Sequence, residues 1–147
     1  MITQYNVQFE RNKGDDIISE VRGLQDIKNL FVEIRFHAWQ KDESALKSTL
    51  HMIEKKRAMA NNFENALQRD IFIYCFDSLK TSIEEQRYEF AGDFADAVHN
   101  LPEVFCHKWI LKNYWKLYIM PLREKHGNHF FDDFRNIFKM ETLNYAE

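Results

Sequence analysis

Residues 15–34, DDIISEVRGLQDIKNLFVEI, decide the fold of this chain. Apolar residues recur here at steps of three and four, at Ile17, Ile18, Val21, Leu24, Ile27, Leu30, Phe31 and Ile34. This spacing places them on one face of an α-helix, which predicts that the face packs against a hydrophobic core. Residues 4–9 and 32–39 also alternate between apolar and polar types, as two strands of a β-hairpin would, but a helix remains the main interpretation.

Capping residues mark where the next helices should begin. Asp42 can accept a backbone hydrogen bond at the start of a second helix, which should end near residue 61. A capping box pairs a polar cap with an acid three residues later. Such boxes occur at Asn61 with Glu64 and at Ser82 with Glu85, and they predict the starts of a third and a fourth helix.

Two prolines organise the C-terminal part of the chain. Pro102 suits the first turn of a further helix, and Pro121 should end or kink that helix. After a break at Gly127, apolar spacing predicts a last short helix over residues 130–138. The sequence therefore predicts one all-α domain over residues 1–147, a bundle of about six helices, with residues 1–13 as a short strand or extended arm.

Composition excludes several classes of protein. The 147 residues are 45% hydrophobic and include only 4 Gly and 2 Pro, which argues against disorder and against a turn-rich β architecture. The net charge of −3 makes nucleic acid an unlikely partner. No signal-peptide pattern and no apolar run of membrane length occur, so we expect a cytoplasmic protein without a membrane segment. Cys75 and Cys106 lack a CxxC partner and are predicted to be buried, reduced thiols.

Residues 90–102, FAGDFADAVHNLP, carry the most distinctive polar pattern. Asp93, Asp96 and His99 follow one another at three-residue steps, an arrangement that metal ligands or an acid–base pair could use. On a helical wheel, however, Gly92, Asp96 and His99 fall opposite the phenylalanines, as the solvent-facing side of an amphipathic helix does. Because no second element supplies ligands at a suitable spacing, no metal site is predicted.

The same segment resembles one found in small bacterial helical proteins, in which an alanine- and aspartate-containing helix ends in His-Asn-Leu-Pro. The resemblance covers about a dozen residues of this chain. It implies a helical bacterial protein in which Asp96 and His99 matter, and it attaches no reaction or ligand to them.

Arg123 and His129, in the segment REKHGNH, resemble the Arg-x(4–6)-His motif of HEPN-type ribonucleases. This resemblance implies a compact helical domain that cleaves RNA without a metal ion. His129 would then perform acid–base catalysis, while Arg123 would stabilise phosphate charge. A possible metal cluster in this region consists of His126, His129, Asp132 and Asp133. A loop, followed by two aspartates at the positive N-terminus of the last predicted helix, explains these residues more simply.

The main functional prediction is a small, cofactor-free module that binds another protein, and specifically an immunity-type inhibitor of a bacterial toxin. Glycine-rich phosphate loops and nucleophile motifs are absent, which leaves no support for a nucleotide cofactor or for nucleophilic catalysis. An acidic surface would complement a basic toxin, and its predicted binding residues are Glu85, Glu89, Asp93, Asp96 and His99. The HEPN-like ribonuclease is the alternative.

Overall fold

The computed structural model describes residues 7–104 and 113–127, with side chains from residue 22 onwards except at residues 103, 104 and 115. All regular structure in these ranges is helical, which confirms the all-α prediction. The elements are α1 (Val7–Trp39), α2 (Glu43–Ala60), α3 (Ala66–Glu84), α4 (Tyr88–Val98), α5 (Leu101–Val104), the π-helical segment η1 (Trp115–Ile119) and α7 (Met120–His126). The helix predicted over residues 130–138, and with it the total of about six, lies outside the described residues.

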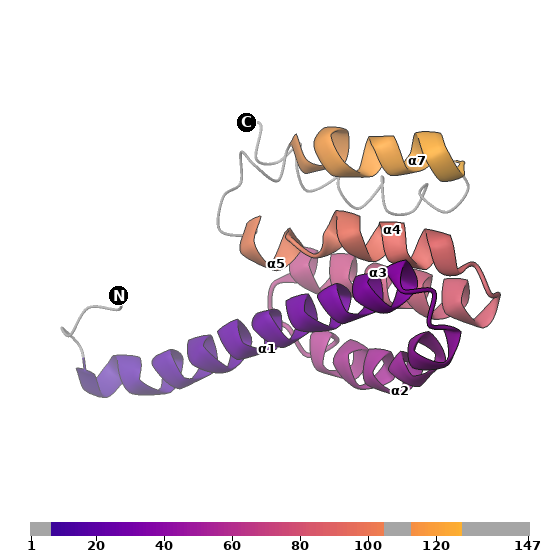
Figure 1. Cartoon of the computed structure of the whole chain (residues 1–147). Helices are drawn as coiled ribbons and strands as arrows, with labels where there is room; N and C mark the ends of the chain where they lie inside the picture. The colour runs from indigo at the N-terminus through magenta and orange to yellow at the C-terminus, as the bar shows by residue number, and fades with distance from the viewer. Residues whose placement is uncertain (1–6, 105–112, 128–147) are drawn as a thin grey trace.

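Helix α1 runs without interruption for 33 residues. Its last turns contain residues 32–39, which confirms the helix as the main interpretation there over the alternative of a β-hairpin strand, and residues 7–13 form its first turns rather than an extended arm. The helical spacing prevails because it buries Ile27, Phe31 and Ile34 together, which an alternating strand could not do. Figure 1 shows the N-terminal part of α1 projecting beyond the other labelled helices. Residues 1–6 lie outside the described part of the chain.

Helix α4 occupies the middle of the arrangement. It packs against α1, α3 and α7, while α2 packs against α1 and α3 (Figure 1). Gly92 is buried where α4 meets α1, which corrects its predicted place on a solvent-facing side. The core side chains are contributed by all of these helices, with the largest being Phe31, Phe72, Phe76, Phe90, Phe94 and Tyr114. Helix α4 is therefore packed on both sides and leaves only a narrow polar edge.

The capping predictions meet different outcomes. Asp42 caps α2, since its carboxylate accepts a hydrogen bond from the Ala45 amide at 3.1 Å. The cap of α3 is Asn65, which accepts from the Gln68 amide at 2.9 Å, and not Asn61. Ser82 is fully buried inside α3 and donates to the Ser78 carbonyl, so the predicted capping box there is wrong. A serine that faces the core donates its hydroxyl hydrogen bond to a carbonyl of its own helix. A capping serine, by contrast, must stand at the start of a helix, where backbone amides are still unpaired.

Helices α1 and α3 end in the same way. The Asp42 amide donates to the His37 carbonyl and the Arg87 amide to the Ser82 carbonyl, which is the long hydrogen bond of a Schellman motif. The residues just before these amides, Lys41 and Gln86, have φ angles of 56° and 62°. Glycine usually occupies this left-handed position because it has no Cβ. Both helix ends are thus closed by residues with long side chains.

The C-terminal helical stretch contains an irregularity beside Pro121. Residues 115–119 form a π-helical turn, and α7 continues from it with Pro121 near its start. A proline ring clashes with the carbonyl four residues earlier in a regular α-helix, and a widened turn relieves that clash. The helical stretch therefore continues through Pro121, and the effect of the proline is the widened turn just before it. Gly127, with a φ of 98°, follows the last residue of α7.

Candidate binding site on helix α4

The polar edge of α4 carries three acidic side chains. Glu89, Asp93 and Asp96 are separated by four and three residues, so they line up along one side of the helix. Neighbouring helices confine this edge, with α1 on one side and α7 on the other. Cations from both neighbours reach it: Arg35 from α1 and Lys125 from α7.

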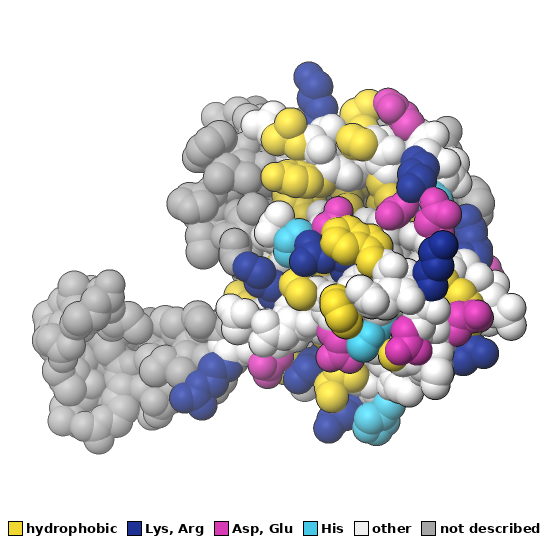
Figure 2. All heavy atoms as spheres, viewed as in Figure 1, with side chains coloured by type: hydrophobic (Ala, Val, Ile, Leu, Met, Phe, Trp, Pro, Cys, Tyr) yellow, Lys and Arg dark blue, Asp and Glu magenta, His cyan; other side chains and the backbone are white. Residues whose placement is uncertain are grey.

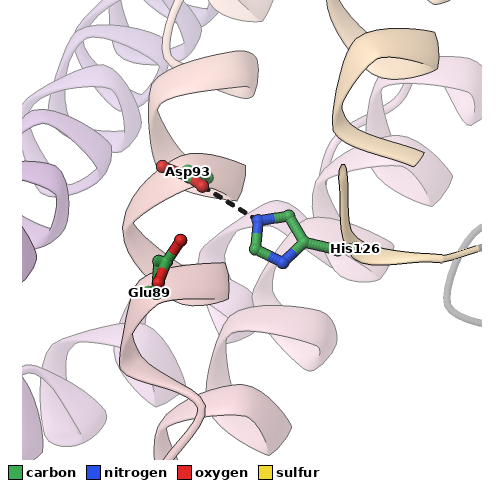
Figure 3. Close-up of side chains that lie close together, drawn as sticks. All are labelled: Glu89, Asp93 and His126. Carbon is green, nitrogen blue, oxygen red and sulfur yellow. Dashed lines mark hydrogen bonds and ion pairs between the residues drawn. The ribbon is translucent and has the colours of Figure 1, made fainter. Parts of the chain in front are cut away.

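Asp93 is the centre of a four-residue cluster. The Lys125 ammonium lies 2.8 Å from the Asp93 carboxylate and 3.1 Å from that of Glu89. The His126 Nε2 lies 2.9 Å from the same Asp93 oxygen, and Figure 3 shows the imidazole pointing across from α7 toward α4. The His126 ring also meets the Phe90 ring edge-on, with centroids 5.1 Å apart. This packing fixes the position of the imidazole beside Asp93.

The cluster stabilises the ionised form of Asp93. Burial by itself would raise the pKa of this carboxyl, but the hydrogen bonds from Lys125 and His126 outweigh burial and leave the pKa below its ordinary value. The same interaction with Asp93, assisted by Glu89, raises the pKa of Lys125. The edge of α4 therefore carries a negative charge that already holds one ammonium group.

A second polar group lies one turn further along α4. The Arg35 guanidinium donates to Asp96 at 3.0 Å and lies over the Trp39 ring, 5.0 Å from its centroid. The His99 Nδ1 lies 2.6 Å from the Asp96 carbonyl oxygen, which can only accept, so Nδ1 carries the proton. Arg35 thus connects α1 to α4 while holding one side of the Trp39 ring.

Two hollows flank this edge. The larger, about 600 Å³, lies between the α1–α2 turn, the α3–α4 turn and the first turns of α4. We call it the Trp39 cleft; its lining residues are Ala38, Trp39, Lys41, Glu43, Leu46, Gln86, Tyr88, Glu89 and Asp93. The smaller, about 400 Å³, lies between α4, η1 and α7 and is lined by Asp96, His99 and Leu117 among others. Asp93 borders both hollows.

The lining of the Trp39 cleft combines apolar side chains with mostly acidic charged ones. Trp39 is 59% exposed although it has the largest side chain, and Leu46, which lines the same cleft, is fully buried. The Tyr88 hydroxyl in the cleft wall is buried and has no hydrogen-bond partner among the described residues. Figure 2 shows hydrophobic side chains interspersed with cationic and acidic ones over this face, rather than one block of like charge. Exposed aromatic surface beside charges is typical of a recognition site.

The structure brings most of the predicted site residues together. Asp93, Asp96, His99 and Glu89 all lie along the edge of α4. Glu85, by contrast, is exposed at the end of α3 and is not among the residues that line either hollow. For the ribonuclease alternative, Arg123 is half-buried on α7 and His129 lies outside the described residues.

Sequence reasoning missed the residues that other elements bring to this edge. Trp39 and Lys125 carry no local signal, because only the packing of α1 and α7 against α4 places them there. Tyr88 is the first residue of α4 itself, and its type alone does not mark it as part of a cleft. His126 was grouped with residues that follow it in the chain, whereas its contact is with Asp93 on α4. The sequence indicated this site only through the aspartates Asp93 and Asp96 on the amphipathic helix α4.

Comparison with known protein families, curated proteins and solved structures finds no match for this chain. Within residues 7–104 and 113–127, none of the helices has the length and apolar character required to cross a membrane.

Proposed function

We propose that this protein binds a basic segment of another protein in the Trp39 cleft. Aromatic side chains that combine an exposed ring with nearby polar groups are enriched at the centres of protein interfaces. Trp39 offers such a ring, and the apolar side chain of Leu46 lines the same cleft. The cleft volume of about 600 Å³ suits a few side chains of a partner rather than a whole helix.

The charge around the cleft favours a basic partner. Its lining includes the carboxylates of Glu43, Glu89 and Asp93 but one cation, Lys41. Lys125 offsets part of this charge from outside the cleft lining. Together with the net charge of −3, the excess of carboxylates favours the approach and correct orientation of a lysine- or arginine-rich segment.

The observation that carries the proposal is the placement of Lys41 and Gln86. Each occupies a left-handed helix-end position where glycine would be less strained, and both side chains line the Trp39 cleft. Backbone strain of this kind costs about 1–2 kcal/mol per residue and concentrates at binding sites. Contact with a ligand would explain why these two positions carry long polar side chains instead of glycine.

The partner class that fits this chemistry is a basic enzyme that the chain inhibits. We propose specifically an immunity-type role, in which binding blocks the active site of a basic toxin. Support comes from the acidic residues of the cleft lining and from the small helical scaffold, which presents Glu89 and Asp93 on the packed helix α4. In this form of the proposal the partner loses its activity when the complex forms.

Variant-dependent capture tests the proposal. Tagged protein is used to isolate partners from the native lysate, and a purified partner is then titrated calorimetrically against Trp39→Ala and Glu43→Gln. We expect Trp39→Ala to weaken binding at least tenfold, since a central aromatic contributes about 2 kcal/mol or more. Met52→Ala and Glu64→Gln serve as matched controls, because Met52 and Glu64 are exposed but do not line the cleft.

Each outcome decides between hypotheses. Equal binding by the Trp39 variant and its controls would remove the cleft from the interface and refute the proposal. Recovery of RNA without a protein, together with metal-independent RNA cleavage that Arg123→Ala abolishes, would replace it with the ribonuclease alternative. Thermal unfolding of every variant confirms that the fold is retained.

A further inference from the structure

A set of metal-ligand side chains converges beside the Trp39 cleft. One ligand atom each from Glu89, Asp93 and His126 lies within 4.8 Å of the other two. The ligands come from two helices, because Glu89 and Asp93 are one turn apart on α4 and His126 ends α7 (Figure 3). Carboxylate oxygens and imidazole nitrogens are both zinc ligands, and three protein ligands with a water in the fourth position make an open tetrahedral site.

We propose that Glu89, Asp93 and His126 bind a divalent cation of the Zn²⁺ type. This inference does not rest on the proposed partner-binding function. Zinc takes carboxylate and imidazole ligands at about 2.0–2.2 Å, so the edges of a tetrahedral site measure roughly 3.3 Å. The 2.9 Å between His126 Nε2 and Asp93 Oδ2 is already close to such an edge.

His126 is held in place before any ion arrives. Its side chain is 12% exposed and its ring packs edge-on against Phe90. Pre-positioned ligands lose little conformational freedom on binding. The Glu89 side chain is 74% exposed and can rotate to bring its carboxylate to the ion.

Lys125 already lies against the two carboxylates of the proposed site. Its ammonium lies within 3.1 Å of both carboxylates, which shows that Glu89 and Asp93 together already hold a cation. The Lys125 side chain is 56% exposed, so it can leave the carboxylates for solvent when a metal ion takes its place. The ammonium and the metal ion therefore compete for the same carboxylates. Removing a ligand should weaken metal binding, whereas removing the ammonium should strengthen it.

Space for the remaining ligands lies next to the cluster. A hollow of about 350 Å³ is lined by Glu89, Lys125 and His126, together with residues of the α3–α4 turn. Water can enter there and occupy the open coordination position. A site with an open position is reachable by small anionic groups as well as by water.

The test uses the full-length protein, freed of metal with a chelator, and zinc ions alone as the probe. We expect isothermal titration to show one equivalent of Zn²⁺ bound, with a rise in melting temperature that chelator reverses. Asp93→Asn and His126→Ala should weaken binding at least tenfold. Lys125→Met should strengthen binding, because it removes the competing ammonium. His51→Ala and Glu124→Gln are matched controls, since both residues are exposed and neither belongs to the ligand set.

Three results would overturn the proposal. One is the absence of zinc binding in both the unaltered protein and Lys125→Met. Another is binding that survives in Asp93→Asn and His126→Ala, which identifies an adventitious ion only. The third is a Lys125→Met protein that binds zinc more weakly than the unaltered chain. The visible absorption of bound Co²⁺ gives a second readout that reports ligand geometry and does not depend on stability. Neither readout involves a protein partner, so this proposal and the proposed function fail separately.

Discussion

Gly92 on α4 and Ala38 on α1 approach so closely that a Cβ atom built on Gly92 would lie 2.5 Å from the Cβ of Ala38. Carbon atoms in contact are ordinarily about 3.5–4.0 Å apart, so any side chain at residue 92 forces the two helices to separate. This crossing sets the distance between α1 and the acidic edge of α4. The width of the Trp39 cleft therefore depends on the absence of a side chain at Gly92.

Gly92→Ala should destabilise the protein. Overpacking costs about 1–3 kcal/mol. We expect this cost to exceed the gain of about 1 kcal/mol that alanine brings to a helix. Urea unfolding measures the difference, and Ala38→Gly introduced into the Gly92→Ala protein should restore part of the loss. Gly23→Ala is the matched control, because its Cβ would meet the flexible Met59 side chain at 3.3 Å and the Phe63 ring at an ordinary contact distance of 3.7 Å. Equal stability of the Gly92 and Gly23 variants would show that the crossing is not tight.

Lys41→Gly and Gln86→Gly should each stabilise the fold and weaken partner binding. Glycine removes the strain of the left-handed conformation, a gain of up to about 1–2 kcal/mol before its own entropy cost of about 1 kcal/mol is subtracted. Chemical unfolding gives the stability and calorimetry with the isolated partner gives the affinity. A glycine variant that binds as well as the unaltered chain would mean that these two side chains serve no ligand.

Two tyrosines should respond oppositely to loss of the hydroxyl. Tyr88→Phe removes a buried hydroxyl that has no hydrogen-bond partner in the described structure, so we expect unchanged or higher stability. Tyr114→Phe removes a buried hydroxyl that donates to the Ala97 carbonyl, and should cost about 0.5–1.5 kcal/mol. Urea titrations of the pair provide the comparison. A clear loss in Tyr88→Phe would reveal a bond to its hydroxyl.

The Cys75 thiol should react only when the protein unfolds. Cys75 is fully buried, and burial raises the pKa of its thiol well above the ordinary value, which suppresses the reactive thiolate near neutral pH. Iodoacetamide labelling of the Cys75-containing peptide, followed by mass spectrometry, should track the unfolded fraction across a urea series. Rapid labelling without urea would contradict the buried position, and labelling in concentrated urea supplies the control.

The helical class of this fold was predictable because its signals are local. Spacing of apolar residues identified the face of α1, and Asp42 identified the start of α2 correctly. Ser82 shows where local signals fail, since a serine before an acid reads as a cap until tertiary packing places it in the core. The alternative of a strand at residues 32–39 does not form, because alternation over a few residues cannot compete with a helix that buries a whole face.

The candidate site was predictable only in its α4 half. Asp93 and Asp96 stood out because they interrupt an apolar helix at regular steps. Lys125 and His126 contact Asp93 from about thirty positions later in the chain, through the packing of α7 on α4. The spacing of apolar residues does not indicate which helices pack side by side. The residues that contact the acidic edge of α4 can therefore be identified only from the three-dimensional structure. Gly92 is a similar case, since only the crossing shows why it lacks a side chain.

The π-helical turn at residues 115–119 bears on how this protein can change during evolution. A π turn is an α-helix that has taken in one extra residue. Deleting one residue there would restore regular α-helical spacing, and the ring of Pro121 would then clash with the carbonyl four residues earlier. Descendants of this sequence can therefore exchange side chains in this segment more readily than they can shorten it while Pro121 is kept.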